Sequence, residues 1–379
     1  MKLTFGTATL DITDRALDRE PIGTAYFDLL RAFLVDTYRT CGYYRRRFDA
    51  AKLDPATLAS FDEIRRVPAL WPHEVATVSE LDLLDDTHAA RLADGDLGSL
   101  DPRERIAKKF QSSGSQGKPK TSFYTVADWE AAQAIVLRKI AHLPRASFAR
   151  IFNAFHPGHI AGKLLEDSFN RGGFHVENRH FATAPEHTMQ QIYASLAQRP
   201  FTCLLLPPRA PTGTTQKGHT LADLLVDDHE NFIGRHVRAI VVSGAARDLP
   251  GDDLKEAVWE VNRLADAPQT MFVDSYGTSE VAAVAAAECE HHAGVHILQG
   301  LTYTEVIDRE TGRHVANGQT GLVVCTGLRR GSRYVRYVVG DEATYITDPC
   351  KCGRASPRLH DIRRVLELEK LADGCAAGW

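Results

Sequence analysis

A ten-residue segment, Gln111 to Lys120, carries residue types that suit the binding of a polyphosphate. It contains three serines, two glycines and two lysines. Glycines let backbone N–H groups converge on one point, and hydroxyl and ammonium groups add donors and positive charge there. The segment is not a Walker A loop, because Ser112 stands where that motif needs its first glycine. On residue types alone it predicts either a phosphate-binding loop or a flexible turn.

Two further segments combine a turn with a functional side chain. Tyr276-Gly-Thr-Ser-Glu280 offers an aromatic face, a close backbone approach and a carboxylate, which suit a nucleotide base with a magnesium ion beside it. Taken alone, the tyrosine also fits core packing and the glutamate a helix start. Asp341 ends the segment that begins at Tyr337, and a strand-end carboxylate can accept both hydroxyls of a ribose. An aspartate after glycine is also common in turns.

The elements that must position these segments are predicted by the hydrophobic pattern. Short, nearly all-apolar runs separated by helical patterns indicate a layered α/β core with much parallel sheet. The expected strands are 150–155, 202–206, 239–243, 271–274 and 322–326. The expected helices are 25–50, 125–143, 159–170, 185–198, 219–231 and 251–266. Several candidate loops directly follow the strands, where ligands bind in open α/β sheets.

The composition excludes several classes of protein. The chain has 379 residues, of which 44% are hydrophobic and 25% charged, as in ordinary soluble globular proteins. A net charge of −4 gives no general basic field, so neither nucleic acid nor an anionic membrane is expected as a partner. We find no apolar run long enough to span a membrane and no secretory signal. Seven cysteines without a framework pattern predict a cytoplasmic protein whose thiols are free or bound to metal.

In content and order, these segments resemble the motifs of the adenylate-forming superfamily. Residues 112–120 resemble its phosphate-binding loop, 244–247 its adenine-side loop, 276–280 its Tyr-Gly-x-[ST]-Glu motif and 337–341 its Tyr-Arg-Thr-Gly-Asp motif. The phenylacetate–CoA ligase branch is the more similar one, through residues 43–49, 288–297, 305–308 and 350–354. The resemblance implies the large α/β domain of these enzymes over residues 1–360 and a short tail over 361–379.

The resemblance also implies an activity and its residues. It predicts ATP- and Mg²⁺-dependent activation of a carboxylic acid, aryl or otherwise small, to an acyl-adenylate. Because a carboxylate that attacks the α-phosphorus meets negative charge, Mg²⁺, backbone donors and lysines must neutralise that charge. The catalytic residues it implies are Lys118, Lys120, Thr278 and Glu280. The nucleotide-binding residues it implies are Ser112, Ser113, Gly114, Ser115, Gly117, Gly244, Ala245, Ala246, Tyr276, Gly277 and Asp341.

Three cysteines and a histidine form a candidate metal site. Three Cys and one His make a closed tetrahedral set that suits structural Zn²⁺, although unpaired cytosolic thiols also fit the residues. Metal-bearing members of the phenylacetate–CoA ligase branch are similar here. The resemblance therefore implies zinc, with His291 as a substitute for the histidine. The ligands it favours are Cys289, His296, Cys350 and Cys352.

The similarity fades over residues 358–364. The small mobile domain that supplies a lysine and rotates for thioester formation in full-length relatives is expected to be absent. The acyl group is then expected to pass to a carrier-protein thiol, CoA or an amine, or a partner subunit supplies the lysine. An alternative is an acyl-protein synthetase-like enzyme that uses Cys375. A further alternative is a non-catalytic nucleotide- or zinc-binding module, against which Lys118, Glu280 and Asp341 argue.

Overall fold

A computed structural model describes residues 1–112, 119–155, 158–178, 201–206, 235–243 and 251–365, together with the single positions 194, 198 and 368. At 251–254, 257 and 261 the description covers the backbone only. Among the described residues, no helix combines the length and the apolar character needed to cross a membrane.

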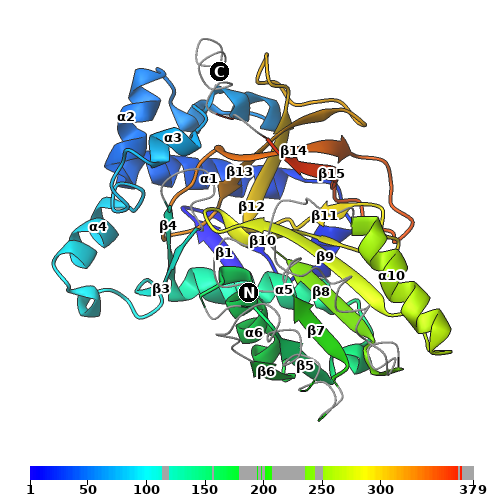
Figure 1. Ribbon diagram of the computed structural model, residues 1–379. Helices are drawn as coiled ribbons and strands as arrows, with labels where there is room; N and C mark the ends of the chain where they lie inside the picture. Colours follow the sequence, from blue (N-terminus) through cyan, green and yellow to red (C-terminus); the bar gives the residue numbers. More distant parts are fainter. Residues whose placement is uncertain are drawn as a thin grey trace.

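One large sheet organises the described chain. Its parallel half contains β5 (Arg150–Asn153), β6 (His175–Asn178), β7 (Cys203–Leu206), β8 (Ala239–Ser243) and β9 (Met271–Thr278). Its antiparallel half adds β10 (Ala282–Glu288), β11 (Val295–Ile297), β12 (Thr302–Ile307), β13 (Thr320–Gly327), β14 (Tyr337–Ile346) and β15 (Arg358–Arg364). The eleven strands follow the order β12-β13-β14-β15-β11-β10-β9-β8-β7-β5-β6 (Figure 1).

The predicted strands are confirmed, and the parallel pairing is confirmed for four of them. β5, β7, β8 and β9 pair in parallel, and the fully buried β7 and β8 explain why their sequences are continuously apolar. The fifth prediction, 322–326, falls in β13, which pairs only with antiparallel neighbours. β13 is nearly all buried as well, so its apolar run could not reveal its direction. The predicted domain boundary at residue 360 falls within β15.

The prediction of one helix over 25–50 is wrong, because two helices occupy this stretch. α1 (Thr24–Thr40) and α2 (Gly42–Ala50) meet at Cys41, whose backbone is extended. The Cys41 thiol donates to the carbonyl of Asp82 over 3.3 Å, and the Gly42 N–H donates to the Asp86 carboxylate over 3.0 Å. These contacts with a distant segment fix the break.

The helix start predicted at Thr125 is confirmed. α5 (Val126–Ile140) begins with a capping box, in which the Thr125 hydroxyl accepts from the N–H of Asp128 and the Asp128 carboxylate accepts from the N–H of Thr125. α6 (Ile160–Arg171) and α10 (Gly251–Leu264) match two more predicted helices. The helices predicted over 185–198 and 219–231 lie outside the described residues, apart from positions 194 and 198.

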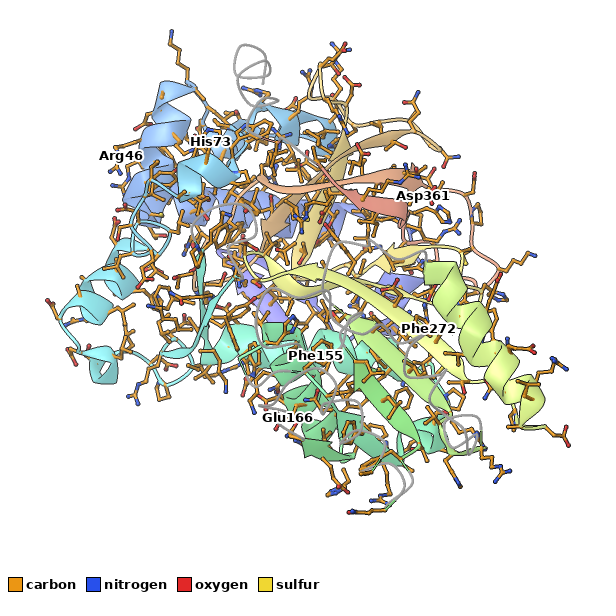
Figure 2. The ribbon with its side chains drawn as sticks, in the orientation of Figure 1. Arg46, His73, Phe155, Glu166, Phe272 and Asp361 are labelled. Carbon is orange, nitrogen blue, oxygen red and sulfur yellow. The ribbon has the colours of Figure 1, made fainter. Side chains whose placement is uncertain are left out.

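Two of the hydrophobic clusters among the described residues join helices to the sheet. One joins α1 and α2 to the antiparallel half, and the other joins α5 and α6 to the parallel half. In the second cluster, Phe155 packs against α6 (Figure 2). Phe272 of β9, which is not in that cluster, faces α10. The remaining elements are β1 (Lys2–Phe5), β2 (Ala8–Asp11), η1 (Arg15–Asp18), η2 (Pro55–Thr57), η3 (Phe61–Arg66), α3 (Pro72–Val75), α4 (Asp86–Ala93), η4 (Leu97–Ser99), β3 (Ile106–Gln111), β4 (Thr121–Thr125) and η5 (Arg145–Phe148).

Candidate functional site

The two strands of a β-hairpin flank the candidate phosphate loop. β3 and β4 pair antiparallel, and Gln111 lies opposite Thr121. Beyond that pair the Ser112 N–H donates to the carbonyl of Lys120, and the Lys120 N–H donates to the Ser112 hydroxyl, both over 2.9 Å. Ser112 therefore closes the base of the loop. Outside the described residues lie Ser113, Gly114, Ser115, Gly117, Lys118, Gly244, Ala245, Ala246 and Cys375.

Hydrogen bonds from β4 fix the hairpin against the rest of the site. The Ser122 hydroxyl donates to the carbonyl of Glu280 over 3.2 Å. The chain between β13 and β14 also contacts β4. The N–H of Phe123 donates to the Ser332 hydroxyl over 2.9 Å, and the Tyr334 hydroxyl donates to the carbonyl of Thr121 over 2.8 Å. The base of the phosphate loop and the turn that carries Glu280 are thus held together.

The Tyr-Gly-Thr-Ser-Glu segment forms the end of β9 and the turn into β10. Glu280 lies in that turn, so the alternative interpretation of it as a helix-start residue is wrong. The Thr278 hydroxyl accepts from the N–H of Val281 over 3.0 Å and stabilises the turn. A Cβ on Gly277 would lie 2.3 Å from the carbonyl oxygen of Ala283, so glycine is required where the hairpin backbone approaches itself.

Tyr276 and Asp341 meet across the sheet. The Tyr276 hydroxyl donates to Asp341 Oδ2 over 2.9 Å. Burial, together with the Asp341 carboxylate, raises the pKa of the tyrosine well above its usual range. The other carboxylate oxygen of Asp341 lies 3.2 Å from Nε of Arg364, which stands opposite Asp341 in the β14–β15 register. Sequence reasoning missed Arg364, and only the strand register could have indicated it.

Lys120 belongs to the same charged region. Its side chain is buried, and burial lowers its pKa; attraction to Glu280 opposes this shift and repulsion from Arg364 adds to it. The Tyr337 hydroxyl is buried there without a hydrogen-bond partner among the described residues. The charges that act on the Tyr337 phenol include Glu280 and Arg364. The structure therefore brings the described residues of three predicted motifs into one region.

The loop between β13 and β14 supports this region with buried arginines that sequence reasoning also missed. Arg329 lies over the ring of Tyr124, with its guanidinium carbon 4.2 Å from the ring centroid. It donates to the carbonyl of Glu280, and to that of Ser332 over 3.0 Å. The turn that presents Glu280 is therefore held through its backbone, independently of the glutamate side chain.

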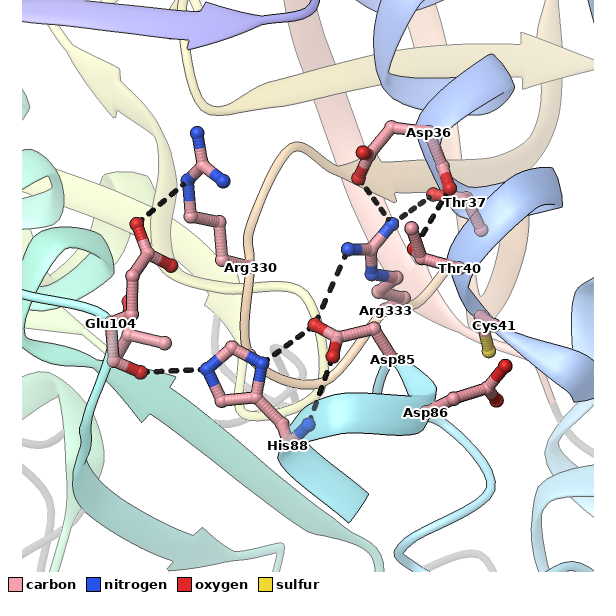
Figure 3. A network of polar contacts seen from close by, with 12 residues as sticks. Asp36, Thr37, Thr40, Cys41, Asp85, Asp86, His88, Glu104, Arg330 and Arg333 are labelled. Atoms are coloured by element: carbon pink, nitrogen blue, oxygen red, sulfur yellow. Dashed lines mark hydrogen bonds and ion pairs between the residues drawn. The ribbon is translucent and has the colours of Figure 1, made fainter. Parts of the chain in front are cut away.

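The same loop enters a network of buried polar groups (Figure 3). Arg333 donates to Asp36 over 2.8 Å, and its guanidinium lies 3.6 Å from Asp85. Asp85 Oδ2 is 2.6 Å from Nδ1 of His88, and Nε2 of His88 is 2.7 Å from the carbonyl oxygen of Glu104. Both ring nitrogens thus face acceptors, which requires both to donate and makes the imidazole a cation.

This arrangement predicts a loss of stability above neutral pH. Burial lowers the pKa of His88, but Asp85 outweighs burial and the net shift is upward. A raised pKa in the folded state means that the stabilisation is complete below the unfolded value of about 6.5 and is lost as the pH rises through the folded value. The thermal midpoint should therefore fall between about pH 6 and about pH 9 by more in the wild type than in His88→Gln. Parallel pH profiles of the two proteins would contradict this assignment.

The candidate metal ligands also meet. Cys289 follows β10, His296 lies in β11, and Cys350 and Cys352 lie in the turn before β15. Their four ligand atoms all lie within 4.8 Å of one another. Within the group, the sulfurs of Cys289 and Cys350 are 3.7 Å apart, and the Cys352 sulfur is 3.4 Å from Nε2 of His296. His291 is not in this group.

Hydrogen bonds orient the histidine of this group. Nδ1 of His296 lies 3.2 Å from both the carbonyl and the hydroxyl oxygen of Ser356. Because a carbonyl can only accept, Nδ1 carries the proton and Nε2 presents its lone pair towards Cys352. Burial and the nearby cations Lys139 and Arg354 lower the pKa of His296 to about 3, so the ring is neutral. A neutral imidazole is the form that binds metal.

Comparison with solved structures identifies the class of fold. An open conformation of 2-hydroxyisobutyryl-CoA ligase in complex with 2-HIB-AMP and CoA is similar with a TM-score of 0.68 and 21% identity, over 91% of this chain and 76% of that one. The same ligase in the thioesterification state gives 0.69 and 21%, over 94% and 72%. The chain has the fold of the adenylate-forming ligases.

Comparison with curated sequences identifies the branch. Phenylacetate–coenzyme A ligase from Thermus thermophilus is 25% identical over 350 residues, which cover 91% of this chain and 71% of that protein. The ligase of the same name from Aromatoleum evansii is 27% identical over 370 residues, which cover 94% and 73%. That from Escherichia coli K12 is 24% identical over 375 residues, which cover 92% and 74%. No family model matches the chain. The chain is thus similar to phenylacetate–CoA ligases over more than nine-tenths of its length and has the fold of adenylate-forming ligases, as the motifs predicted.

Proposed function

We propose that this chain is an ATP-dependent, AMP-forming ligase that activates an aryl or other small carboxylic acid as its acyl-adenylate and transfers the acyl group to coenzyme A. The observation that carries the proposal is that Lys120, Glu280 and the Tyr276–Asp341–Arg364 group share one region. CoA is the acceptor we favour, because the curated relatives are named as CoA ligases. A carrier-protein thiol or an amine is the alternative acceptor.

The residues present fit a magnesium nucleotide. Two carboxylates, Glu280 and Asp341, lie near the cations Lys120 and Arg364, and the Tyr337 hydroxyl has no partner among the described residues. Mg²⁺, when bound, would neutralise charge on the phosphates. In this proposal Glu280 and Thr278 hold that ion and the phosphates, Asp341 with Arg364 binds the ribose, and Tyr276 lies beside the nucleoside.

The cationic and small residues of the segment 112–120 complete the proposed site. Lys120 and Lys118 attract the phosphates, and the backbone N–H groups of the segment that Ser112 closes donate to them. The adenine would lie against the segment after β8, where Gly244, Ala245 and Ala246 resemble the adenine-side loop. The acid itself supplies the nucleophile, so the chain has to orient it in line with the α-phosphorus and offset its charge.

Carboxylate-dependent exchange of pyrophosphate into ATP tests the proposed activity. We expect exchange with some members of a panel of aryl and short aliphatic acids, and AMP release with thioester formation when CoA is added. Nucleotide binding without exchange would instead favour a non-catalytic module. Exchange that needs a second protein would indicate a lysine supplied in trans. Acyl label that remains on the protein, and is lost in Cys375→Ala, would favour an acyl-protein synthetase.

We also propose that Cys289, His296, Cys350 and Cys352 hold a structural Zn²⁺. Three thiols and one oriented imidazole with mutual distances of at most 4.8 Å suit tetrahedral zinc and leave no open position for a substrate. The ion would join the end of β10 and β11 to the turn before β15. Metal analysis of the purified protein should find about one zinc per chain. Less than about half an equivalent, with Cys350→Ser no different from the wild type, would refute this site.

A further inference from the structure

A buried arginine from the loop between β13 and β14 reaches the turn that carries Glu280. Arg329 is only 2% exposed. Its Nη2 donates to the carbonyl of Glu280, and to that of Ser332 over 3.0 Å. Nε and Nη1 are buried without a hydrogen-bond partner among the described residues, so the hydrogen bonds of this guanidinium go to backbone carbonyls. Because burying a charge without a carboxylate partner costs stability, this arrangement favours a role for Arg329 in the site rather than in folding.

Asp128, near the start of α5, fixes the loop from which Arg329 reaches. Its Oδ1 accepts from the N–H of Arg330 over 2.9 Å, and its Oδ2 accepts from the N–H of Gly331 over 2.8 Å. Oδ2 also accepts from the N–H of Thr125 over 3.0 Å, in the capping box of α5. One carboxylate therefore caps the helix and holds the two residues that directly follow Arg329.

Close packing holds the guanidinium itself in place. Its central carbon lies 4.2 Å from the ring centroid of Tyr124, in β4. Tyr124, Asp128 and Arg329 line a cavity of about 10 Å³, which Val281, the residue directly after Glu280, lines as well. A cavity of this size holds no more than about one water molecule. The side chain of Arg329 therefore has little room to move away from the turn.

The carbonyl of Glu280 accepts two side-chain hydrogen bonds, one from the hydroxyl of Ser122 and one from Arg329. Hydrogen bonds from a charged donor are the stronger kind, so Arg329 is expected to contribute more than Ser122. The Cα of Glu280 is bonded to the carbon of that carbonyl. Fixing the carbonyl therefore fixes the direction in which the carboxylate side chain leaves the backbone.

We propose that Arg329 is a positioning residue, which holds the Glu280 carboxylate at the magnesium nucleotide through its hydrogen bond to the Glu280 carbonyl. The inference rests on the proposed function, in which Glu280 holds the Mg²⁺ ion. In this arrangement Arg329 contacts the turn and not the ion or the nucleotide. Asp128 acts one step further away, because it fixes the loop that carries Arg329. Loss of Arg329 should loosen the metal site and leave its carboxylate in the chain.

The first test compares Arg329→Met and Arg329→Lys with the wild type, below the unfolding transition of each protein. Calorimetric titration with ATP, in Mg²⁺ and in EDTA, gives the factor by which Mg²⁺ strengthens ATP binding. That factor should fall about 10-fold in Arg329→Met, and by less in Arg329→Lys, which keeps a charged donor. The Mg²⁺ concentration for half-maximal ATP–pyrophosphate exchange should rise in the same order. Arg313→Met, at an exposed arginine between β12 and β13, is the matched control and should change neither value.

A double-mutant cycle tests whether Arg329 acts through Glu280. Arg329→Met should reduce the residual exchange of Glu280→Gln much less than it reduces exchange in the wild type, so the two losses should not be additive. If Arg329→Met does not fold, Arg329→Gln enters the same cycle, because glutamine keeps a donor and removes the charge.

Additive losses, or an unchanged Mg²⁺ effect on ATP binding in a folded Arg329→Met, would overturn the proposal and leave Arg329 a packing role. A wild type without carboxylate-dependent exchange would overturn the proposed function and this inference with it. An active wild type with an additive cycle would overturn the inference alone, so the two failures are distinguishable.

Discussion

Replacing Glu280 by glutamine is expected to reduce carboxylate-dependent ATP–pyrophosphate exchange by about 10²- to 10³-fold and to leave the fold intact. The exchange should fall because the neutral amide loses the charge that the proposed Mg²⁺ site needs. The fold should survive because the chain holds this turn through the backbone. Ser122 and Arg329 both donate to the carbonyl of residue 280, and the substitution leaves those bonds in place.

The exchange rate and the thermal midpoint of Glu280→Gln have to be measured on the same preparation. Glu310→Gln is a suitable control, because Glu310 is an exposed acid in the turn after β12. Asp341→Asn would be a less clean test, since Asp341 is buried between Tyr276 and Arg364 and its loss disturbs packing as well. Near-normal exchange in Glu280→Gln would show that the assignment of the metal-binding carboxylate is wrong.

The parts of the fold that could be predicted from the sequence are those with a local signal. β7 and β8 are short and wholly buried, so their apolar runs stand out from the chain. The capping box at Thr125 and Asp128 lies within four consecutive residues and predicts the start of α5. The break at Cys41 has no such signal, because it depends on contacts with residues 82 and 86.

The candidate site likewise contains residues that a local motif reveals and residues that only the tertiary structure reveals. Tyr276, Glu280 and Asp341 could be found because each lies in a short motif of distinctive residues. Arg364 could not be found in this way, because only the strand register places it opposite Asp341. The candidate metal ligands meet for a similar reason, since β11 pairs with β15 and His296 lies opposite Arg358. The resemblance to the ligase branch predicted the four candidate ligands, but only the strand pairing brings them together.

The second large effect is expected at Arg336, the residue directly before β14. Its side chain is fully buried, and Nε lies 3.1 Å from the equally buried carboxylate of Glu305. Nη1 donates to the carbonyl of Arg65 over 2.9 Å and to that of Val67 over 2.7 Å. The guanidinium thus joins β12, β14 and the segment that contains η3. It also fixes the start of the strand that carries Asp341.

Arg336→Met should lower the free energy of unfolding by about 3–5 kcal/mol, because it leaves the Glu305 carboxylate buried without its main counter-charge. Burial raises the pKa of Glu305, but Arg336 and His314 outweigh burial and keep the net shift downward. The carboxyl is therefore ionised in the wild type at neutral pH. Denaturant unfolding monitored by fluorescence measures the change. Arg263→Met, at an exposed Arg263–Glu260 pair of α10, is the control and should leave the free energy of unfolding nearly unchanged, because solvent screens an exposed pair.

The double variant Arg336→Met with Glu305→Gln separates the ion pair from the packing. If the cost of Arg336→Met comes from the stranded carboxylate, neutralising Glu305 should recover part of the stability, and the two changes should not be additive. Additive losses would mean instead that the hydrogen bonds to the carbonyls of Arg65 and Val67 carry the effect. Because β14 also presents Asp341, the variant with the larger loss should also show weaker nucleotide binding at temperatures below its unfolding transition. Unaltered nucleotide affinity in a strongly destabilised Arg336→Met would show that β14 holds Asp341 in place without this anchor.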